Sequence, residues 1–177
     1  MLVLPVARAA TFVLVRPHYP ENVGAAARAI KTMGITSLVL VKPGRLAVPD
    51  HEMAIKMAVK SWDVLEAATQ VGTLDEALDG VDWAFATTAR RGISGIIAPR
   101  RAAEIAAARA VRGERVAFVF GNEKTGLSAE DSALCQERIR IPMAADQPSI
   151  NLAQAVQLVA YELFVTGLAA RGSEQDA

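Results

Sequence analysis

Short apolar runs alternate along the chain with longer stretches that begin or end at helix signals. An apolar run of about five residues, bounded by Gly, Pro or polar residues, is typical of a buried strand. The pattern therefore predicts strands at residues 11–15, 37–41, 83–87, 115–120 and 138–141.

Helices are predicted between these strands from their start and stop signals. Gly34 ends an Ala-rich stretch, and Thr73 with Glu76 has the spacing of a capping box. Ser128, with Asp131 three residues later, opens a further short helix. The longer helical stretches are expected at residues 22–33, 51–60, 73–78, 99–111 and 150–170.

The alternation of strands and helices predicts an α/β fold with a mostly parallel sheet flanked by helices. No repeat, linker or change of composition divides the chain, so residues 1–170 are expected to form a single domain. Residues 171–177 are polar and are expected to form a disordered tail.

The composition limits both the core and the partners. Of the 177 residues, 52% are hydrophobic and 21% are charged, which excludes a disordered chain. Aromatic residues make up only 5%, so we expect a core of aliphatic side chains rather than stacked rings. Basic and acidic residues balance at 19 each, so the basic footprint typical of nucleic-acid-binding proteins is missing. A local patch is sufficient for RNA, and the candidates are Arg90–Arg91 and Arg100–Arg101.

Several classes of protein are disfavoured. Cys135 is the only cysteine, so no intrachain disulfide can form and a reducing compartment is expected. His18 and His51 with one cysteine do not make a zinc site, and no metal is expected. Residues 1–10 lack the parts of a signal peptide, and no charge-free apolar run reaches about 18 residues. We therefore expect a cytoplasmic protein without a membrane span.

Four polar loops hold most of the candidate functional residues. In open α/β sheets, ligands bind outside the carboxyl ends of the strands. In the first loop, Asn22–Arg28, Gly24 allows close backbone approach and Arg28 is suited to binding phosphate. Taken alone, this segment is explained more simply by an N-cap asparagine and a surface arginine.

The second loop, Gly121–Gly126, follows the clearest strand and resembles a phosphate loop in its placement. A Walker loop requires Lys and Ser or Thr directly after its last glycine, but Leu127 and Ser128 follow Gly126, and Glu123 adds negative charge. No strand is followed by Gly-x-Gly-x-x-Gly. Nucleoside triphosphates and NAD are therefore disfavoured as ligands.

The remaining two loops are weak signals on their own. Ser149 is a good helix N-cap, and Asn151 in the following turn is free to bond a neighbouring loop or a ligand. Thr87–Arg91 is a hydroxyl-rich turn that runs into two arginines, and alone it is an ordinary polar loop. Cys135 lies in an amphipathic stretch that favours a small buried residue over a nucleophile.

Together the loops resemble the three ordered motifs of the SpoU/TrmH branch of the SPOUT RNA methyltransferases. The first motif is Asn22 followed six residues later by Arg28, and the second is Phe-Gly-x-Glu-x-x-Gly-Leu at 120–127. The third is Ile141–Pro142 followed by Ser-x-Asn-Leu-Ala-x-Ala-Val at 149–156. Each motif is moderate evidence, and the ordered set is strong evidence.

Within that branch, residues 31–35, the Thr-Thr-Ala-Arg loop, Cys135 and the helix segment 155–162 are similar to the TrmJ subfamily, which modifies tRNA. Pro148 departs from the pattern, because relatives usually have a hydroxyl or small residue there. Few residues follow the last helix, where relatives usually carry an extension that helps to hold tRNA.

The resemblance implies a SPOUT fold with a C-terminal trefoil knot, formed by the last two strands and the long helix, and a homodimer. The helix expected at 150–170 is apolar around much of its circumference. Such a helix must be buried, either in the core of the monomer or in a dimer. Both explanations stay open at the level of sequence.

The implied reaction transfers a methyl group from S-adenosyl-L-methionine (SAM) to a ribose 2′-hydroxyl of tRNA, in the anticodon loop. Ribosomal RNA is an alternative substrate, and a catalytically silent RNA-binding relative is an alternative function. The presence of Arg28, Glu123 and Asn151 counts against the silent relative. By resemblance, SAM is expected to contact Thr87, Thr88, Ala89, Gly121, Ile141, Pro148, Ser149 and Ile150.

The resemblance also implies a catalytic group that consists of Arg28, Asn22, Glu123, Ser149 and Asn151. Arg28, together with Arg90 and Arg91, is expected to bind RNA. Arg28 is often described as the base in this family, but a guanidinium stays protonated in proteins. Binding the phosphate and polarising the hydroxyl is the physically easier role.

Overall fold

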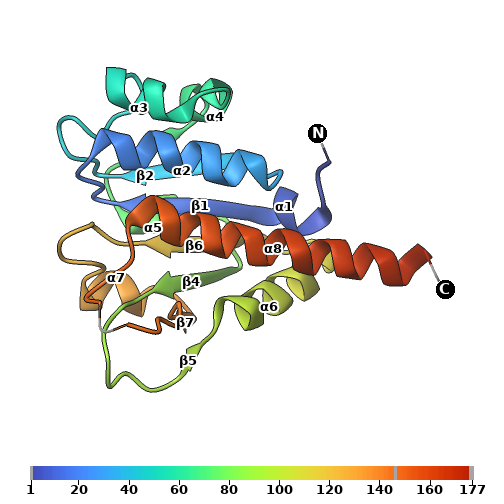
Figure 1. Cartoon of the computed structure of the whole chain (residues 1–177). Helices are drawn as coiled ribbons and strands as arrows, with labels where there is room; N and C mark the ends of the chain where they lie inside the picture. The colour runs from blue at the N-terminus through green and yellow to red at the C-terminus, as the bar shows by residue number, and fades with distance from the viewer. Residues whose placement is uncertain (1, 146, 176–177) are drawn as a thin grey trace.

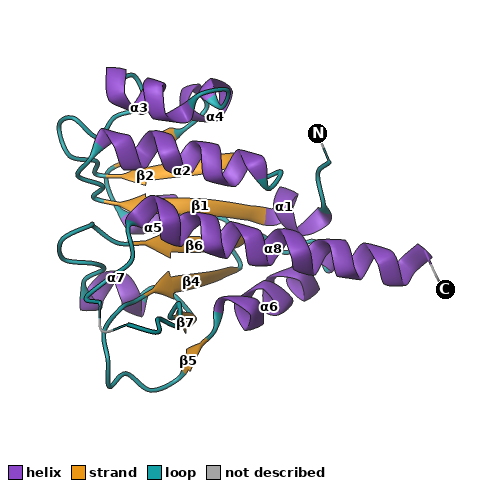
Figure 2. Ribbon diagram, in the orientation of Figure 1, coloured by secondary structure: helices purple, strands orange, loops and turns teal. Residues whose placement is uncertain are grey.

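The computed structural model describes residues 2–145 and 147–175, and a seven-stranded sheet forms its centre (Figures 1 and 2). The strands are β1 (Ala10–Val15), β2 (Ser37–Val41), β3 (Thr69–Val71), β4 (Trp83–Thr87), β5 (Ile96–Ile97), β6 (Val116–Phe120) and β7 (Glu137–Ile139). Their order in the sheet is β3-β2-β1-β6-β4-β7-β5, and every pairing is parallel. The predicted α/β fold with a parallel sheet is therefore confirmed.

Helices cover both faces of the sheet. They are α1 (Pro5–Ala9), α2 (Pro20–Thr32), α3 (Glu52–Ala58), α4 (Trp62–Glu66), α5 (Leu74–Ala77), α6 (Pro99–Val111), α7 (Ala129–Ala133) and α8 (Leu152–Gln175). On one face α8 packs against α1, α2 and α6, while α3 and α4 pack against α2 (Figure 1). Leu74 and Ala77 of α5, with residues that flank α7, cover the other face.

The long apolar patterns and the capping signals predicted their elements well, while several short elements without such signals were missed. The strands at 37–41 and 83–87 and the helix at 99–111 have the predicted bounds. The last strand is Glu137–Ile139 instead of 138–141, and α1, α4, β3 and β5 were not predicted. The expected tail from residue 171 is wrong as far as Gln175, because α8 continues through Arg171. Residues 176–177 lie outside the described residues.

The centre of the core is a layer of stacked aromatic rings. Phe118 stacks on Phe12, with ring centroids 5.5 Å apart, and on Phe85, with centroids 4.8 Å apart. Phe120 also stacks on Phe12, with ring centroids 5.6 Å apart. The expectation of a purely aliphatic core is therefore wrong, because four of the five phenylalanines occupy adjacent positions on β1, β4 and β6. The alanines pack around them, at the helix surfaces that face the sheet.

The position of β7 brings distant segments to one edge of the sheet. β7 lies between β4 and β5, although it follows both in the sequence. The backbone N–H of Thr88 donates to Ile139 O at 2.9 Å, and Arg140 N–H donates to Ile97 O at 3.1 Å. The loops that follow β4 and β7 therefore run side by side. The trefoil knot implied by the resemblance stays a prediction.

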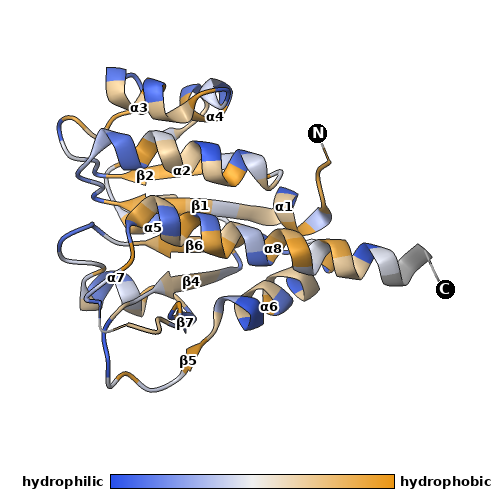
Figure 3. Ribbon diagram, in the orientation of Figure 1, coloured by the Kyte–Doolittle hydropathy of each residue, from blue (hydrophilic) through white to orange (hydrophobic). Residues whose placement is uncertain are grey.

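α8 is apolar over much of its length (Figure 3). Leu152–Gly172 is long and apolar enough to span a membrane by length and composition, with a mean hydropathy of 1.4. A core helix passes the same test, and α8 buries Val156, Val159, Ala160 and Leu163 in the core. On other sides of the helix, Leu158, Tyr161 and Leu168 are exposed.

The aromatic layer makes stability depend on Phe118. We expect Phe118→Ala to lower the free energy of unfolding by about 3–5 kcal/mol, because the substitution leaves a ring-sized cavity between Phe12 and Phe85. Urea denaturation followed by circular dichroism measures this change. Val111→Ala is the control, because Val111 is 79% exposed and its truncation is expected to change stability by less than about 0.5 kcal/mol. Equal effects of the two substitutions would contradict the prediction.

Candidate functional site

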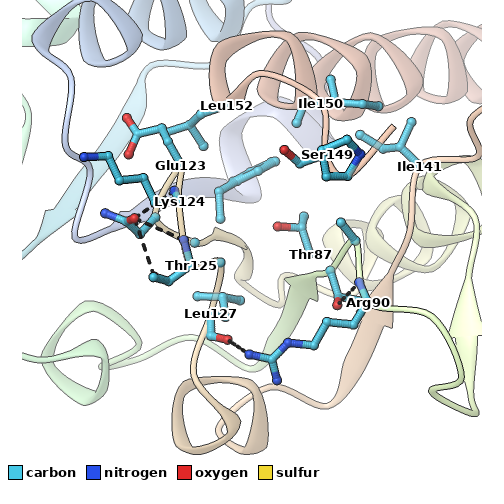
Figure 4. A pocket seen from close by; sticks show the side chains of 18 of the residues that line it. Thr87, Arg90, Glu123, Lys124, Thr125, Leu127, Ile141, Ser149, Ile150 and Leu152 are labelled. Carbon is cyan, nitrogen blue, oxygen red and sulfur yellow. Dashed lines mark hydrogen bonds between the residues drawn. The ribbon is translucent and has the colours of Figure 1, made fainter. Parts of the chain in front are cut away.

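A cavity of about 540 Å³ opens at the carboxyl ends of β4, β6 and β7, next to the start of α8 (Figure 4). This is the edge at which open α/β sheets bind ligands. Its walls come from the segment after β4 (residues 87–90 and 93), from the segment after β6 (residues 120–128 and 132), from the segment between β7 and α8 (residues 139, 141, 143, 148–152 and 155), and from Tyr19 and Asn22 at the start of α2. The cavity is lined by all of the residues expected to contact SAM, namely Thr87, Thr88, Ala89, Gly121, Ile141, Pro148, Ser149 and Ile150.

The walls combine apolar side chains with backbone groups at strand ends. Phe120, Leu127, Ile139, Ile141 and Leu152 supply the apolar part. Two polar side chains at this edge are engaged within the protein. The hydroxyl of Thr87 donates to Val119 O at 3.0 Å, and that of Thr88 accepts from the backbone N–H of Arg90 at 3.1 Å.

The loop after β6 folds back on itself. The N–H of Gly126 donates to Asn122 O at 2.8 Å, and the side-chain oxygen of Asn122 accepts from Lys124 N–H at 2.9 Å. A Cβ at Gly121 would lie 2.2 Å from the Leu127 nitrogen, and Gly126 has a positive φ of 68°. Both glycines are therefore required by this loop, one for space and one for its left-handed conformation.

Glu123 joins this loop to the segment that leads into α2. Its carboxylate accepts hydrogen bonds from His18 N–H at 2.8 Å, from Tyr19 N–H at 3.2 Å and from Asn22 Nδ2 at 3.0 Å. The first two donors immediately precede α2, which begins at Pro20 with Tyr19 as its N-cap residue. Glu123 thus acts as the acceptor that fixes the start of α2 against the β6 loop.

Asn22 continues the connection to α8. Its side-chain oxygen accepts from Asn151 Nδ2 at 3.0 Å, and Asn22 is 8% exposed. The oxygen of Asn151 in turn accepts from Gln154 N–H at 3.2 Å. Three of the predicted catalytic residues, Glu123, Asn22 and Asn151, therefore form one hydrogen-bonded chain between the three motifs.

The capping roles suggested by the sequence are wrong at two positions. Asn22 is not an N-cap, because α2 begins at Pro20 and Tyr19 is the capping residue. Ser149 does not cap α8, because the helix begins at Leu152 and the Asn151 side chain bonds the N–H of Gln154. Ser149 instead lines the cavity, where it is exposed.

The predicted RNA-binding arginines are separated in the structure. Arg90 lines the cavity, and its guanidinium donates to Leu127 O at 3.2 Å, which ties the β4 loop to the β6 loop (Figure 4). Arg91 is exposed and does not belong to the described lining. The arginines of the other candidate patch form ion pairs within the protein. Arg100 pairs with Glu162 at 3.0 Å, and Arg101 pairs with Glu104 at 2.9 Å.

Arg28 is not brought to the cavity of this chain. It lies on α2 with an exposed side chain, and it is not among the described residues that line the cavity. Asn22, six residues earlier, is buried at the cavity wall. Six residues correspond to about 600° of rotation, so the two side chains leave the helix in different directions. The first motif therefore combines Asn22, which is buried at the cavity wall, with Arg28, which is exposed to solvent on α2.

Gly24 does allow close approach, but the approaching backbone belongs to α3. A Cβ at this position would lie 2.0 Å from Ala54 O. The glycine therefore sets the contact between α2 and α3, and this contact is part of the packing that holds α2 at the edge of the cavity.

Cys135 has the properties of a structural residue. The side chain is buried, and burial, together with the nearby Asp131, raises the pKa of its thiol to about 12. Asp131 has a lowered pKa because, although burial opposes it, the Arg16 guanidinium and Ser128 donate hydrogen bonds to the carboxylate. Ser128 opens α7 as predicted, and it forms a capping box with Asp131. A protonated, buried thiol is a poor nucleophile.

Sequence reasoning did not single out Tyr19, Asn122 or Lys124 of the lining. Asn122 and Lys124 lie within the second motif, so their position next to Glu123 was the available signal. A lone tyrosine after a strand carries no comparable signal. Within the described part of the chain, His, Cys, Asp and Glu residues form no group of three or more that could hold a metal ion.

A model of the SpoU rRNA Methylase family matches residues 9–161. The chain belongs to this family.

The TrmJ protein of Pseudomonas aeruginosa (strain UCBPP-PA14), named a tRNA (cytidine/uridine/adenosine-2′-O-)-methyltransferase, is 41% identical over 162 residues, which are 90% of this chain and 62% of that protein. The crystal structure of a probable methyltransferase from Bordetella pertussis Tohama I has a TM-score of 0.85 and 39% identity, with 91% of this chain and 97% of that one covered. The crystal structure of TrmJ from Z. mobilis ZM4 has a TM-score of 0.79 and 35% identity, with 89% of this chain and 69% of that one covered. The chain spans about 60% of the length of the curated relatives it matches.

The position of Glu123 in this SpoU family member generates a prediction. Glu123→Ala leaves His18 N–H, Tyr19 N–H and Asn22 Nδ2 without their acceptor. We expect the free energy of unfolding to fall by about 1–3 kcal/mol. We also expect the backbone amides of residues 18–22 to exchange hydrogen faster. Thermal unfolding and hydrogen–deuterium exchange mass spectrometry measure the two effects.

Glu130→Ala provides the matched control, because Glu130 is an exposed carboxylate on α7. We expect it to leave the exchange at residues 18–22 unchanged. If Glu123→Ala also left that exchange unchanged, the carboxylate would not be what holds the start of α2.

Proposed function

We propose that this protein is a SAM-dependent methyltransferase that acts on a ribose 2′-hydroxyl of tRNA, in the anticodon loop. The observation that carries the proposal is the cavity, because one ligand-sized space is lined by residues from each of the three motifs, with Arg28 outside it. The identity to the P. aeruginosa TrmJ protein supports tRNA as the substrate. The family description names ribosomal RNA, which makes that RNA the second candidate.

The cavity fits SAM in size and chemistry. Its volume of about 540 Å³ lies within the range of roughly 300–1,000 Å³ that is usual for sites of small molecules and cofactors. The apolar wall suits the faces of an adenine ring, and the backbone groups of residues 87–89, 121 and 141 suit its polar edges. Glu123 is the one acidic side chain among the described lining residues, so the wall is not dominated by either charge.

When bound, SAM supplies a methyl group that its own positive charge activates for transfer. The protein then has to orient the acceptor hydroxyl and assist the loss of its proton. Ser149 is an exposed hydroxyl at the cavity wall, and the chain of Glu123, Asn22 and Asn151 holds the surrounding loops in place. In this proposal these residues position the ribose, and the buried Cys135 takes no part.

Arg28 binds a phosphate or polarises the hydroxyl in this proposal. Its exposed position on α2 is open to a macromolecular ligand, and a guanidinium binds phosphate oxygens well. Because it lies outside the cavity, its role concerns the RNA rather than SAM. Arg90 and Arg91 supply further positive charge near the cavity mouth.

A homodimer and a cytoplasmic location complete the proposal. Leu158, Tyr161 and Leu168 are exposed apolar or aromatic residues on α8, and their burial against a second copy would be favourable. The opposite side of the same helix is buried in the core, so a dimer would bury only the side that the monomer leaves exposed. A tRNA substrate is consistent with the cytoplasm.

The proposed function predicts transfer of labelled methyl groups from SAM to unmodified tRNA. We expect transfer to tRNA to exceed transfer to ribosomal RNA, and nuclease mapping to find a 2′-O-methyl group in the anticodon loop. SAM binding, measured by calorimetry without RNA, separates the steps. Transfer only to ribosomal RNA would favour the second substrate, binding without transfer would favour the silent relative, and absence of SAM binding would overturn the enzyme hypothesis.

Arg28→Ala separates RNA binding from SAM binding. We expect the rate of methylation to fall by about 100-fold or more, because the reacting hydroxyl loses a group that positions it. SAM affinity should stay unchanged, since Arg28 does not line the cavity. Arg8→Ala removes another exposed arginine, on α1, and should leave both quantities unchanged. A near-normal rate for Arg28→Ala would refute the proposed role.

A further inference from the structure

A second cavity of about 620 Å³ lies beside the first. Its wall is formed by residues 18–21, by Gly44, Arg45 and Leu46 after β2, and by His51 and Met53 at the start of α3. Tyr19 belongs to the walls of both cavities. None of the residues that define the three motifs lines this second cavity, so the motifs do not explain it.

Tyr19 is held at the boundary by contacts on several sides. Its backbone N–H donates to Glu123 at 3.2 Å, and its ring meets the His18 ring edge-on, with centroids 4.6 Å apart and planes at 89°. Tyr19 nevertheless remains exposed, at 42% for the whole residue. An aromatic ring with a fixed backbone and an exposed surface loses little conformational entropy when a ligand stacks on it.

Positive charge accompanies the ring. Lys124 Nζ lies 5.7 Å from the centroid of the Tyr19 ring and 3.3 Å from His18 Nε2. Arg45 is an exposed side chain in the wall of the second cavity, and Glu21 is the only carboxylate among the described residues of that wall. Aromatic rings beside cationic side chains are the features with which proteins bind single-stranded nucleic acid.

We propose that the second cavity receives the nucleotide next to the methylated one, with its base stacked on Tyr19 and a phosphate near Arg45 or Lys124. This inference rests on the proposed function, in which the target ribose reaches the first cavity. Successive nucleotides are joined by a single phosphate, and the two cavities meet at a single residue. Tyr19 is therefore a binding residue that positions the RNA, and it takes no part in the transfer itself.

Steady-state kinetics with unmodified tRNA provide the first test. Stacking on an aromatic ring predicts that Tyr19→Ala raises KM for tRNA about tenfold. We expect kcat and SAM affinity to change little, and Tyr19→Phe to restore the low KM because it keeps the ring. Trp62→Ala is the matched control, since Trp62 is an aromatic residue on α4 that is 41% exposed and absent from the described walls of both cavities.

A binding experiment tests the site without methyl transfer. A single-stranded oligoribonucleotide that carries 2-aminopurine loses fluorescence when the base stacks on an aromatic ring. We expect the wild-type protein and Tyr19→Phe to quench this fluorescence, and Tyr19→Ala to quench it much less. Arg45→Gln should reduce the salt dependence of binding, because one phosphate contact is lost.

The outcomes distinguish this inference from the proposed function. Methyl transfer with equal KM values and equal quenching in wild type and Tyr19→Ala would overturn the nucleotide site and leave the enzyme function intact. Failure of all methyl transfer would overturn the function, while quenching lost only in Tyr19→Ala would still support the site. A raised KM that Tyr19→Phe does not restore, together with a lower melting temperature, would indicate a structural role and overturn the inference.

Discussion

The hydrogen bonds of the Glu123 carboxylate hold together segments that are about one hundred residues apart in the sequence. Its three donors belong to His18, Tyr19 and Asn22, at sequence separations of 105, 104 and 101. Asn22 extends the connection to Asn151, 129 residues further along. The amide of Asn22 is oriented by both partners, since its nitrogen donates to Glu123 and its oxygen accepts from Asn151. An aspartate there would set two carboxylates against each other, so this position requires an amide.

The parallel sheet brings these loops within reach of one another. β1 and β6 are neighbours, and their carboxyl ends lead into α2 and into the loop of residues 121–128. The rings of Phe12, Phe118 and Phe120 stack on these two strands, so the strands that carry the loops also share the aromatic layer of the core. The loops that line the cavity thus start from strands that are fixed by packing in the sheet.

Much of this arrangement could be predicted from the sequence, because long apolar runs and capping signals are local. The bounds of β2, β4 and α6 followed from such patterns. β3 and β5 did not, since Thr69–Val71 and Ile96–Ile97 are too short for a period to show. The stacked phenylalanines were missed for another reason. A low aromatic content says nothing about whether the few rings share a layer, which depends on strand order.

In the candidate site, too, the features that local sequence determines were predicted, and those that depend on tertiary contacts were not. The residues expected to contact SAM line one cavity because three ordered motifs identified the loops, and parallel strands bring loop ends together. Sequence spacing could not give the surroundings of Arg28, because they depend on which side of α2 packs inward. It also could not find Tyr19, whose position between two cavities depends on contacts with His18, Glu123 and Lys124.

The place of β7 has a consequence for how the protein acquires its structure. Within the described residues β5 pairs with β7 at the edge of the sheet, and β7 pairs with β4 on its other side. During synthesis, β5 leaves the ribosome about forty residues before the strand that attaches it to the sheet. Pairing of β5 with β7 therefore has to wait until residues 137–139 have been made. The cavity walls that follow β7 are likewise synthesised after the strands that carry Phe12, Phe85, Phe118 and Phe120.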